Sequence, residues 1–595
     1  MKLLSRNLIL LFVSIAASVG VSAQENTVAK NLPDSRIADE KPTPAAADAK
    51  SNENVRSGTV RVGIHSAEPI SLSLDDAIRK ALASNNDIEV SRDDVRFQET
   101  SVLSIQGLYD PVFTVSPTFN RNSTTGNAST KDFSVNADLR GSIRPGGGTY
   151  QAFFNNTRTE NAFSQAQVSN GSVSGTSAIF LSSTGVRYTQ PLLRNFSIDS
   201  TRRNLKIARR RLEQSDADFR RTTIETIARV QNAYWDLVFA LRDQQNRQAN
   251  LDLSRENLRQ IEARISAGAS APLARAEVET ELANRESDLL LATQQVSIFE
   301  NSLKQLLLRD ATSAEWTQPY VPTDRPAFSS DPINLENALK DAMDNRFELQ
   351  RLKLARDINK IDVDYFRNQT RPQIDLNTTL SLDGLSQGGA STSPILFPQF
   401  SGNEDILRGR VNQLLGINNL PLIPNPNVEI PGTPSYLAGG FGRSLRNLFR
   451  SDAPNYSVGV TISFPFRNRT AKANLAGAEI TRNQLDTQTR IQEQTVIVEV
   501  RNSVQAVETA RQRVLASRRA RENAEIQLEG ERRLFESGRS TSFLLFQREN
   551  SLTNARNAEI RAETDYNKAI ANLQRATSTT FELNNIQVTS PIDVK

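Results

Sequence analysis

The residue types that most often carry out chemistry are nearly absent from this chain. There is one histidine, His65, and no cysteine, so the sequence excludes thiol nucleophiles, cysteine and histidine zinc clusters, and histidine general bases. His65 lies in a polar stretch, where a lone histidine is expected to be solvated. Paired carboxylates remain available for acid and base catalysis, yet no pair stands out from the charges on the predicted helices. We therefore predict no enzyme activity, no catalytic residue, no bound metal and no cofactor.

Two other features could contact a ligand. A phosphate-binding loop needs a lysine after its glycines and a following helix, and the glycine run 146–148 lacks both, so it indicates a turn. An arginine-rich stretch, 202–221, suggests a polyanion-binding helix as a competing function. Acidic residues interleave with these arginines, and the net charge of the chain is only +4. The mixture is typical of a solvated helix face, so we predict no nucleic-acid partner.

The N-terminus has the features of an export signal. Lys2 and Arg6 precede an apolar run from residue 8 to 17, and small residues end the segment at 21–23, before Gln24. An anchoring helix is the alternative, but a bilayer span needs about 20 apolar residues and this run is shorter. We expect residues 1–23 to be removed as a signal peptide. The polar stretch 24–70, which contains several prolines, is predicted to be a disordered leader.

The rest of the chain consists of two copies of one unit, 71–330 and 331–580, followed by a tail, 581–595. The helical segment at Val230 recurs at Val500, and Gly268 recurs at Gly538, so both features are offset by the same distance along the chain. Each copy opens with a helix that a serine or an asparagine caps. The doubling predicts an architecture and does not by itself predict a function.

Each copy ends in a helical hairpin of unusual length, 199–308 in the first and 470–577 in the second. At about 1.5 Å per residue, the incoming helices would reach on the order of 100 Å, more than an ordinary globular core needs. Gly268 and Gly538 can close these helices in the left-handed conformation. The returning helix of the first copy has an apolar seam typical of a coiled coil. This seam consists of Leu282, Leu289, Val296 and Leu303, with Ala292, Phe299 and Leu306 on the partner positions.

Between the opening helix and the hairpin, each copy alternates apolar and polar residues with the period of a strand, within 111–192 and within 372–466. Strands of about 10 residues with one apolar face suit either a soluble sandwich or an outer-membrane barrel, and the strands alone leave both open. The order of elements places all strands at one end of the long helices, which favours the barrel. So few strands per chain cannot close a barrel of channel width, and we predict an oligomer.

At this point the chain resembles a known family, the TolC-like outer-membrane efflux proteins, from about residue 72 to 578. The similar features are the opening Leu72–Ala77, the strand end Tyr188–Arg194, the helix at Ala233–Leu237 and the glycine at both hairpin tips. The resemblance implies an α+β membrane protein with a two-fold internal repeat. It implies a homotrimer whose outer-membrane β-barrel, with about four strands or more per protomer, continues as a periplasmic coiled-coil barrel of helices.

The same resemblance implies a passive export duct for efflux or type I secretion. A periplasmic adaptor (membrane fusion) protein would connect it to an inner-membrane pump of the RND or ABC class, and outer-membrane lipid would surround its barrel. A structural coiled-coil protein of the periplasm or surface, without channel activity, is the alternative. Helix capping is the plain role of the tip glycines, and adaptor docking would be an added one. The docking residues would be Gly268, Ser270, Leu273, Gly538, Arg539 and Ser540.

The chain departs from the family in three places. Where many members carry aspartates that narrow the closed tunnel, it has Leu544 and Gln547. We expect either an apolar constriction that includes Phe543 or ordinary coiled-coil packing. The stretch 132–158 is an extra hairpin that either adds two strands or forms a flap. The polar, proline-containing segment 387–454 is longer than a hairpin loop and is predicted to lie at the cell surface. The sequence does not identify the exported substrate.

Overall fold

The fold is taken from a computed structural model, in which the chain separates into a unit of residues 1–58 and a unit of residues 59–595. The expected signal peptide, most of the expected leader, and Ser270 lie outside the described residues. All described residues belong to the second unit. They are 61, 63–64, 68–123, 125, 129–160, 178–268, 271–388, 392–450, 453–589 and 592.

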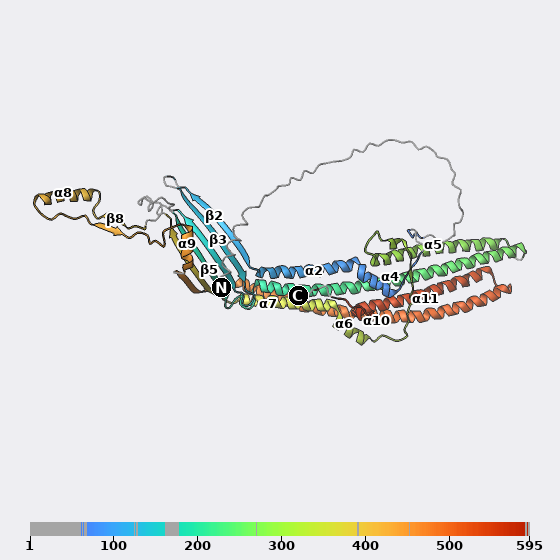
Figure 1. The fold of residues 1–595 in the computed structure, drawn as a ribbon. Coiled ribbons are helices and arrows are strands. Elements are labelled where there is room, and N and C mark those ends of the chain that lie inside the picture. The colour runs from blue at the N-terminus through green and yellow to red at the C-terminus, as the bar shows by residue number, and fades with distance from the viewer. Residues whose placement is uncertain are drawn as a thin grey trace, which may run out of the picture. The chain divides into compact units, whose positions relative to one another are not determined.

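Two pairs of long helices form the longest part of the structure (Figure 1). The first hairpin is formed by α4 (Ser200–Ser266) and α5 (Leu273–Leu307), and the second by α10 (Arg469–Glu536) and α11 (Ser542–Thr577). With 67 residues in α4 and 68 in α10, each incoming helix is about 100 Å long. The internal repeat predicted from the sequence is therefore confirmed.

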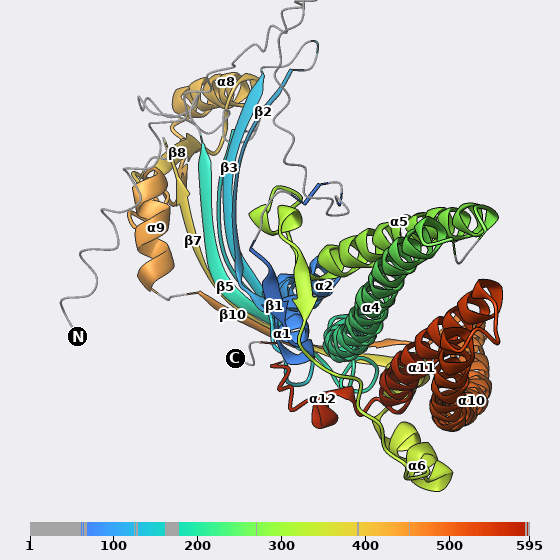
Figure 2. The ribbon, with the colours of Figure 1, turned by 90° about the vertical axis from the view of Figure 1, so that its right-hand side faces the viewer.

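Shorter helices complete each copy: α1 (Leu74–Ser84) and α2 (Asn86–Gln106) in the first, α6 (Leu335–Asn345) and α7 (Phe347–Gln369) in the second. Near the sheet, α2 packs on α4, α4 on α7, and α7 on α10. Toward the hairpin tips the order is α5, α4, α11 and α10 (Figure 2). Both near the sheet and near the tips, α10 is the outermost helix on one side. On the other side the outermost helix is α2 near the sheet and α5 near the tips.

Local side-chain contacts determine where the short helices begin. Ser73 Oγ accepts a hydrogen bond from the backbone N–H of Asp76 at 3.1 Å, which satisfies one of the free donors at the start of α1. Asn85 ends α1 and caps α2, because its Oδ1 accepts from the N–H of Asp87 at 2.9 Å. Its Nδ2 donates to the carbonyl of Leu306 at 2.9 Å. That second contact fixes the bend between α1 and α2 against the end of α5.

Of the seam predicted from the apolar spacing, Leu289, Ala292, Val296 and Leu303 are buried, and Leu282, Phe299 and Leu306 are partly buried. In the first copy, side chains from α4 and α5 pack with α1 in one core cluster. In the second copy, a smaller cluster joins α10 and α11. The fully buried seam residues of the first copy are Ile227, Val230, Tyr234, Leu237, Val296 and Leu303.

The strands form one six-stranded antiparallel sheet in the order β10, β7, β5, β4, β3, β2. The stretch 132–158, for which the sequence left two alternatives, falls on β3 and β4, which lie inside this sheet between β2 and β5. The described chain therefore contributes two strands more than the four that the family pattern implied. The bounds are β2 Val112–Asn122, β3 Thr130–Ser142, β4 Thr149–Thr159, β5 Ile179–Pro191, β7 Gln373–Gln387 and β10 Pro454–Ser463.

One face of this sheet is apolar and the other is polar. Strand register aligns six apolar residues in a single row across all six strands, and most of them are exposed. The row on the opposite face is polar. Alternation along each strand places these rows on opposite faces. The apolar row is Phe113, Leu139, Ala152, Val186, Leu380 and Tyr456, and the polar row is Ser116, Asn136, Asn155, Ser183 and Asp383.

The segment 387–454, expected as a surface loop, contains regular structure: β8 (Ile395–Pro398), α8 (Asn403–Ile417), β9 (Asn427–Ile430) and α9 (Phe441–Arg450). β8 pairs with β9 in a separate two-stranded sheet. The helix α9 packs against β7 and β5.

The remaining elements are short. β1 (Ile70–Leu72) pairs in parallel with β6 (Tyr320–Pro322). The 3-10 helix η1 (Gly107–Tyr109) lies between α2 and β2, the 3-10 helix η2 (Ala314–Thr317) precedes β6, and α12 (Thr580–Leu583) follows α11. β1 begins inside the stretch expected to be a disordered leader. Earlier in that stretch, Arg61 Nη1 contacts the buried Glu300 Oε2 at 2.8 Å. The end of the leader is therefore held on α5. None of the helices in the described ranges is both long enough and apolar enough to cross a membrane.

Candidate functional site

One edge of the molecule carries α2, α5 and β2. Large apolar side chains on its helices are exposed, including Phe97, of which 67% is accessible. Val90 and Phe97 are seven residues apart on α2, and Leu291 and Ile298 are seven apart on α5. This spacing continues a coiled-coil seam. The edge thus has the form of half of a helix interface.

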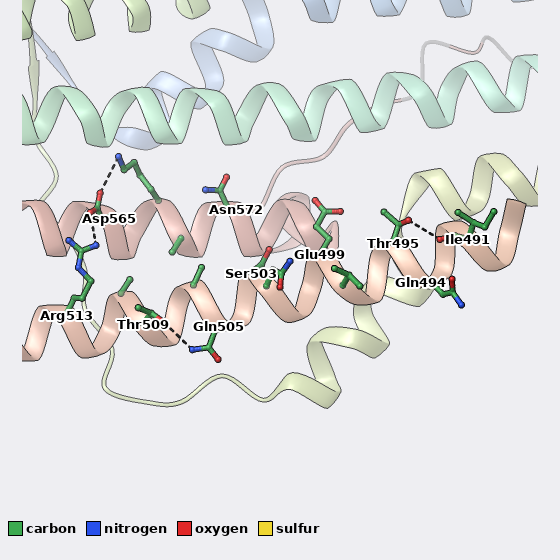
Figure 3. Close-up of a pocket in the computed structure, with 16 residues that line it drawn as sticks. Ile491, Gln494, Thr495, Glu499, Ser503, Gln505, Thr509, Arg513, Asp565 and Asn572 are labelled. Carbon is green, nitrogen blue, oxygen red and sulfur yellow. Dashed lines mark hydrogen bonds and ion pairs between the residues drawn. The ribbon is translucent and has the colours of Figure 1, made fainter.

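The opposite edge carries α10 and β10 and is apolar with the same spacing. Ile491 and Val498 are exposed on α10, seven residues apart. They line a groove of about 1120 Å³ along α10 and α11, which Figure 3 shows in close-up. The floor includes the small residues Ala506, Ala510 and Ala569, and small side chains let another helix approach closely. The groove is shaped to receive a helix.

Charged groups at the groove are already ordered within the chain. Arg513 Nη1 contacts Asp565 Oδ2 at 3.3 Å, the pair joined in Figure 3. Lys568 Nζ lies 3.5 Å from Asp565 Oδ1 and 2.7 Å from Asp236 Oδ1 of α4. These ion pairs fix the rim of the groove and tie α11 to α4.

The two hairpins meet along α4 and α11 through a series of side-chain amides. Asn246 Nδ2 donates to Asn557 Oδ1 at 2.8 Å, and Asn250 Nδ2 donates to Thr553 Oγ1 at 2.6 Å. Closer to the sheet, Asn232 donates to Asn572 at 3.2 Å. Hydrogen bonds of this kind fix the relative register of two helices while burying little apolar surface, so they contribute modest net stability.

Toward the tips, this polar seam contains a buried ion pair. Arg285 of α5 and Glu549 of α11 are only 6% and 2% exposed, and Arg285 Nη2 lies 3.3 Å from Glu549 Oε2. Burial raises the pKa of Glu549, although Arg285 and Asn257 oppose the shift. Arg285 Nε also contacts Glu281 at 2.9 Å. The pair links the two hairpins in a water-poor environment and makes their contact sensitive to the charge of Glu549.

A second charged cluster joins the hairpin to the short helices. Arg346 Nη1 and Arg575 Nη2 each contact the Glu499 carboxylate at 2.8 Å. Burial disfavours the charged form of Glu499, but the two guanidinium groups outweigh it and lower its pKa. Arg346 is buried and also donates to the carbonyl of Ala576 at 2.9 Å. This cluster locks the junction of α6 and α7 onto α10 and α11.

Both hairpin tips are compact turns with exposed surfaces. Gly268 and Gly538 adopt positive φ angles of 70° and 72°, and no atom lies within 4 Å of a Cβ added to either. Arg539 N donates to the carbonyl of Leu534 at 2.9 Å, which closes α10 in the way typical of a glycine cap. Ser540 Oγ contacts Glu531, and Leu273 is exposed. Each tip therefore offers an unobstructed surface next to its glycine.

The apolar run after the second tip divides between two environments. Leu545 and Phe546 are buried, and Phe546 packs against Ile261 of the first hairpin, which is the helix packing weighed as the alternative. Phe543, Leu544 and Gln547 stay exposed. Because they are one and four residues apart, these three lie on one face of α11. The residues expected at a constriction thus share a surface that the described part of the chain leaves exposed.

The sequence analysis missed the Arg285–Glu549 pair. The available signal was a charge at a seam position: Arg285 lies between Leu282 and Leu289 at helical spacing, and Glu549 between Leu545 and Leu552. A charged residue inside an apolar seam indicates a buried partner. Within the described ranges, no group of three or more His, Asp or Glu side chains could hold a metal ion.

Comparison with known families decides the relationship. The model of the family described as outer membrane efflux protein matches residues 154–307 and 424–579, more than half of the chain. The chain belongs to this family. The two matched segments fall on the two copies and include both hairpins, and the resemblance inferred from the sequence is confirmed.

Solved structures give the same fold for this outer membrane efflux protein. The outer-membrane channel OprN is similar, with 16% identity over 85% of this chain and 89% of that one, at a TM-score of 0.55. The Campylobacter jejuni CmeC outer membrane channel has 13% identity, coverage of 87% and 90%, and a TM-score of 0.54. The Neisseria gonorrhoeae MtrE outer membrane channel has 15% identity, coverage of 85% and 88%, and a TM-score of 0.54. No curated protein sequence matches the chain significantly.

Proposed function

We propose that this protein is the outer-membrane subunit of an export system and that three copies close into one passive duct. The observation that carries the proposal is the pair of unlike edges. Within the described chain, β2 pairs only with β3, and β10 only with β7, so each has one free side. The helices next to them, α2 with α5 and α10, have exposed apolar seams on the same two sides.

Unlike edges produce a head-to-tail ring. If β10 and α10 of one copy join β2, α2 and α5 of the next, every copy uses both edges and the ring closes without an open edge. The helix of the neighbouring copy would occupy the groove along α10 and α11. The number three follows from the family resemblance, and each copy would contribute six strands to a shared barrel.

The two faces of the sheet fit this placement. The exposed row that includes Phe113, Val186 and Tyr456 would face lipid, and the polar row that includes Asn136 and Asp383 would face a water-filled lumen. The chain would lie in the outer membrane, with the long helices in the periplasm. A soluble protein that left this apolar row exposed would tend to aggregate.

The hairpin tips would be the contact with the rest of the export system. Gly268, Leu273, Gly538, Arg539 and Ser540 lie on turns that no other described part of the chain covers, and a periplasmic adaptor could dock there. Ser270 belongs to the same proposed surface. The adaptor would connect the duct to an inner-membrane pump of the RND or ABC class, for efflux or for type I secretion.

Phe543, Leu544 and Gln547 would narrow the closed tunnel. Their shared exposed face on α11 supports the proposal, because an apolar constriction in a pore opposes the passage of water and ions. We expect Leu544→Asp to raise the conductance of the closed channel. Conductance equal to that of the wild type would assign Leu544 to helix packing instead.

The decisive experiment uses the absence of cysteine in the chain. Ser116→Cys in β2 and Ser457→Cys in β10, made together, should give disulfide-linked dimers and trimers on oxidation, whereas each single variant should not. A second double variant, Ser116→Cys with Thr461→Cys, tests a different register between β2 and β10. Purified protein in a planar bilayer should give discrete conductance steps. A water-soluble monomer without conductance would favour the structural coiled-coil protein.

A further inference from the structure

The helix α9 lies on the apolar face of the six-stranded sheet. Ser444 and Leu448 are its buried residues, and Ser444 Oγ lies 2.9 Å from Ser182 Oγ of β5. On β7, a Cβ added to Gly384 would lie 2.2 Å from the carbonyl oxygen of Ser444 and 2.5 Å from the backbone nitrogen of Leu448. Only glycine allows α9 to approach this closely.

Polar contacts hold α9 in this position. Asn447 Nδ2 donates to the carbonyl of Leu385 at 2.8 Å and to that of Tyr436 at 2.7 Å. Just before the helix, Ser386 Oγ donates to the carbonyl of Gly440 at 3.0 Å. These bonds connect α9 to β7 over several residues, so the helix is a fixed part of the sheet surface.

Strand register places α9 on the face that would meet lipid. Ser182 pairs with Gly384, and each lies an even number of residues from its own strand's member of the apolar row, Val186 or Leu380. Both positions are at the ends of β5 and β7 remote from α4 and α7. Figure 1 shows α9 at that end of the sheet, away from the long helices. In the proposed duct this end is the extracellular rim.

The sides of α9 that do not touch the sheet differ in chemistry. One side carries Phe441, Leu445 and Phe449, and 74% of Phe449 is accessible. The other side carries three arginines at spacings of three and four residues: Arg443, Arg446 and Arg450. A helix with adjacent apolar and basic sides is typical of the boundary between hydrocarbon and head groups.

Two of these arginines, Arg443 and Arg446, are candidates for binding an external anion. Within the part of the chain that the structure describes, no carboxylate pairs with Arg443 or Arg446. The guanidinium of Arg450 lies 5.5 Å from the ring centroid of Tyr436, an arrangement that keeps the charge while orienting the side chain. Guanidinium groups bind phosphate through paired hydrogen bonds, which lysine cannot reproduce.

We propose that α9 is an interfacial helix whose Arg443 and Arg446 bind the phosphate groups of anionic lipid in the outer leaflet, while its phenylalanines enter the acyl region. The inference rests on the proposed placement of the sheet in the outer membrane. It assigns α9 the role of a lipid-binding collar on the outside of the duct. Acyl chains and phosphates are both required, so free phosphate is a poor substitute.

The test is binding of lipid A, a glycolipid that carries phosphates, to the detergent-solubilised full-length protein, measured by native mass spectrometry. The test variant is Arg443→Gln with Arg446→Gln. The matched control is Arg482→Gln with Arg519→Gln, which removes two exposed arginines from α10. Each basic residue near an anionic surface increases the affinity about fivefold, so we expect loss of two arginines to raise the dissociation constant for lipid A about 25-fold. The control should bind like the wild type.

Several outcomes would overturn the inference. Equal binding by the test and control variants would show that these arginines do not contact lipid. Displacement of lipid A by an equal concentration of inorganic phosphate would assign the site to free phosphate. If assemblies larger than the trimer form with the wild type and the control but not with the test variant, the arginines of α9 contact a second copy of this chain instead of lipid. Planar-bilayer conductance of the same preparations separates the two proposals, because a conducting protein without lipid selectivity contradicts only the role of α9.

Discussion

The buried pair of Arg285 and Glu549 allows a quantitative prediction about contact between the hairpins. Among the described residues, Arg285→Met leaves the Glu549 carboxylate with the side-chain amide of Asn257 as its hydrogen-bond donor, at 3.4 Å and 3.5 Å. An unpaired buried charge costs about 3 kcal/mol at the least. Glu549→Gln should cost only about 1 kcal/mol, because Arg285 keeps Glu281 as a partner. The double variant Arg285→Met with Glu549→Leu should lie within about 1 kcal/mol of the wild type.

Hydrogen exchange of backbone amides in α5 and α11 measures this cost, since local opening exposes them. A loss of about 3 kcal/mol should speed exchange near the tips by roughly 150-fold in Arg285→Met. Arg255→Met is the matched control, because Arg255 forms only long contacts of 3.5 Å to Asp252 and 3.4 Å to Glu286 and is 42% exposed. If Arg285→Met exchanges no faster than Arg255→Met, or if the two single effects simply add in the double variant, the pair does not hold the hairpins together.

Three further predictions test other parts of the structure. Because the pKa of Glu549 is raised in the folded protein, its contribution to stability is fully present below its ordinary pKa and is lost as the pH rises through the folded value. The free energy of local opening at the tips, obtained from exchange rates corrected for the intrinsic pH dependence of amide exchange, should therefore be smaller at about pH 8 than at about pH 5 in the wild type, and Glu549→Gln should remove this difference. Val458→Lys on the apolar face of β10 should lower the stability of the folded protein by about 2 kcal/mol or more, and Ser457→Lys on the opposite face should lower it much less. The amount of folded protein can be followed by heat modifiability on gels. Gly538→Ala should cost about 1 kcal/mol through backbone strain alone, measured by thermal loss of helical circular dichroism; a larger loss would indicate a contact that the turn does not show.

The long helices were predictable because their signals are local. Seven-residue spacing, the cap at Ser73 and the glycine at each tip lie close together in the sequence, and each has a direct physical meaning. The family resemblance rests on the same local motifs. Apolar alternation likewise indicated strands.

The pairing partners were not predictable, because alternation shows that a strand has two faces but not where it lies in a sheet. Residues 132–158 therefore stayed ambiguous until β3 and β4 were placed between β2 and β5. Arg285 and Glu549 are 264 residues apart, beyond any local pattern. The helix α9 was hidden within a segment assigned as a loop, since Gly439, Gly440 and Gly442 lower the helix propensity at its start. Its position depends on one distant glycine, Gly384.

The inserted hairpin of β3 and β4 also determines the bore of the proposed duct. Six strands about 4.8 Å apart, tilted by about 40°, cover roughly 38 Å of circumference, whereas four would cover roughly 25 Å. Four helices packed about 8 to 10 Å apart cover roughly 32 to 40 Å. The six strands of each copy therefore match the width of its helices, and the duct could pass from membrane to periplasm without a taper.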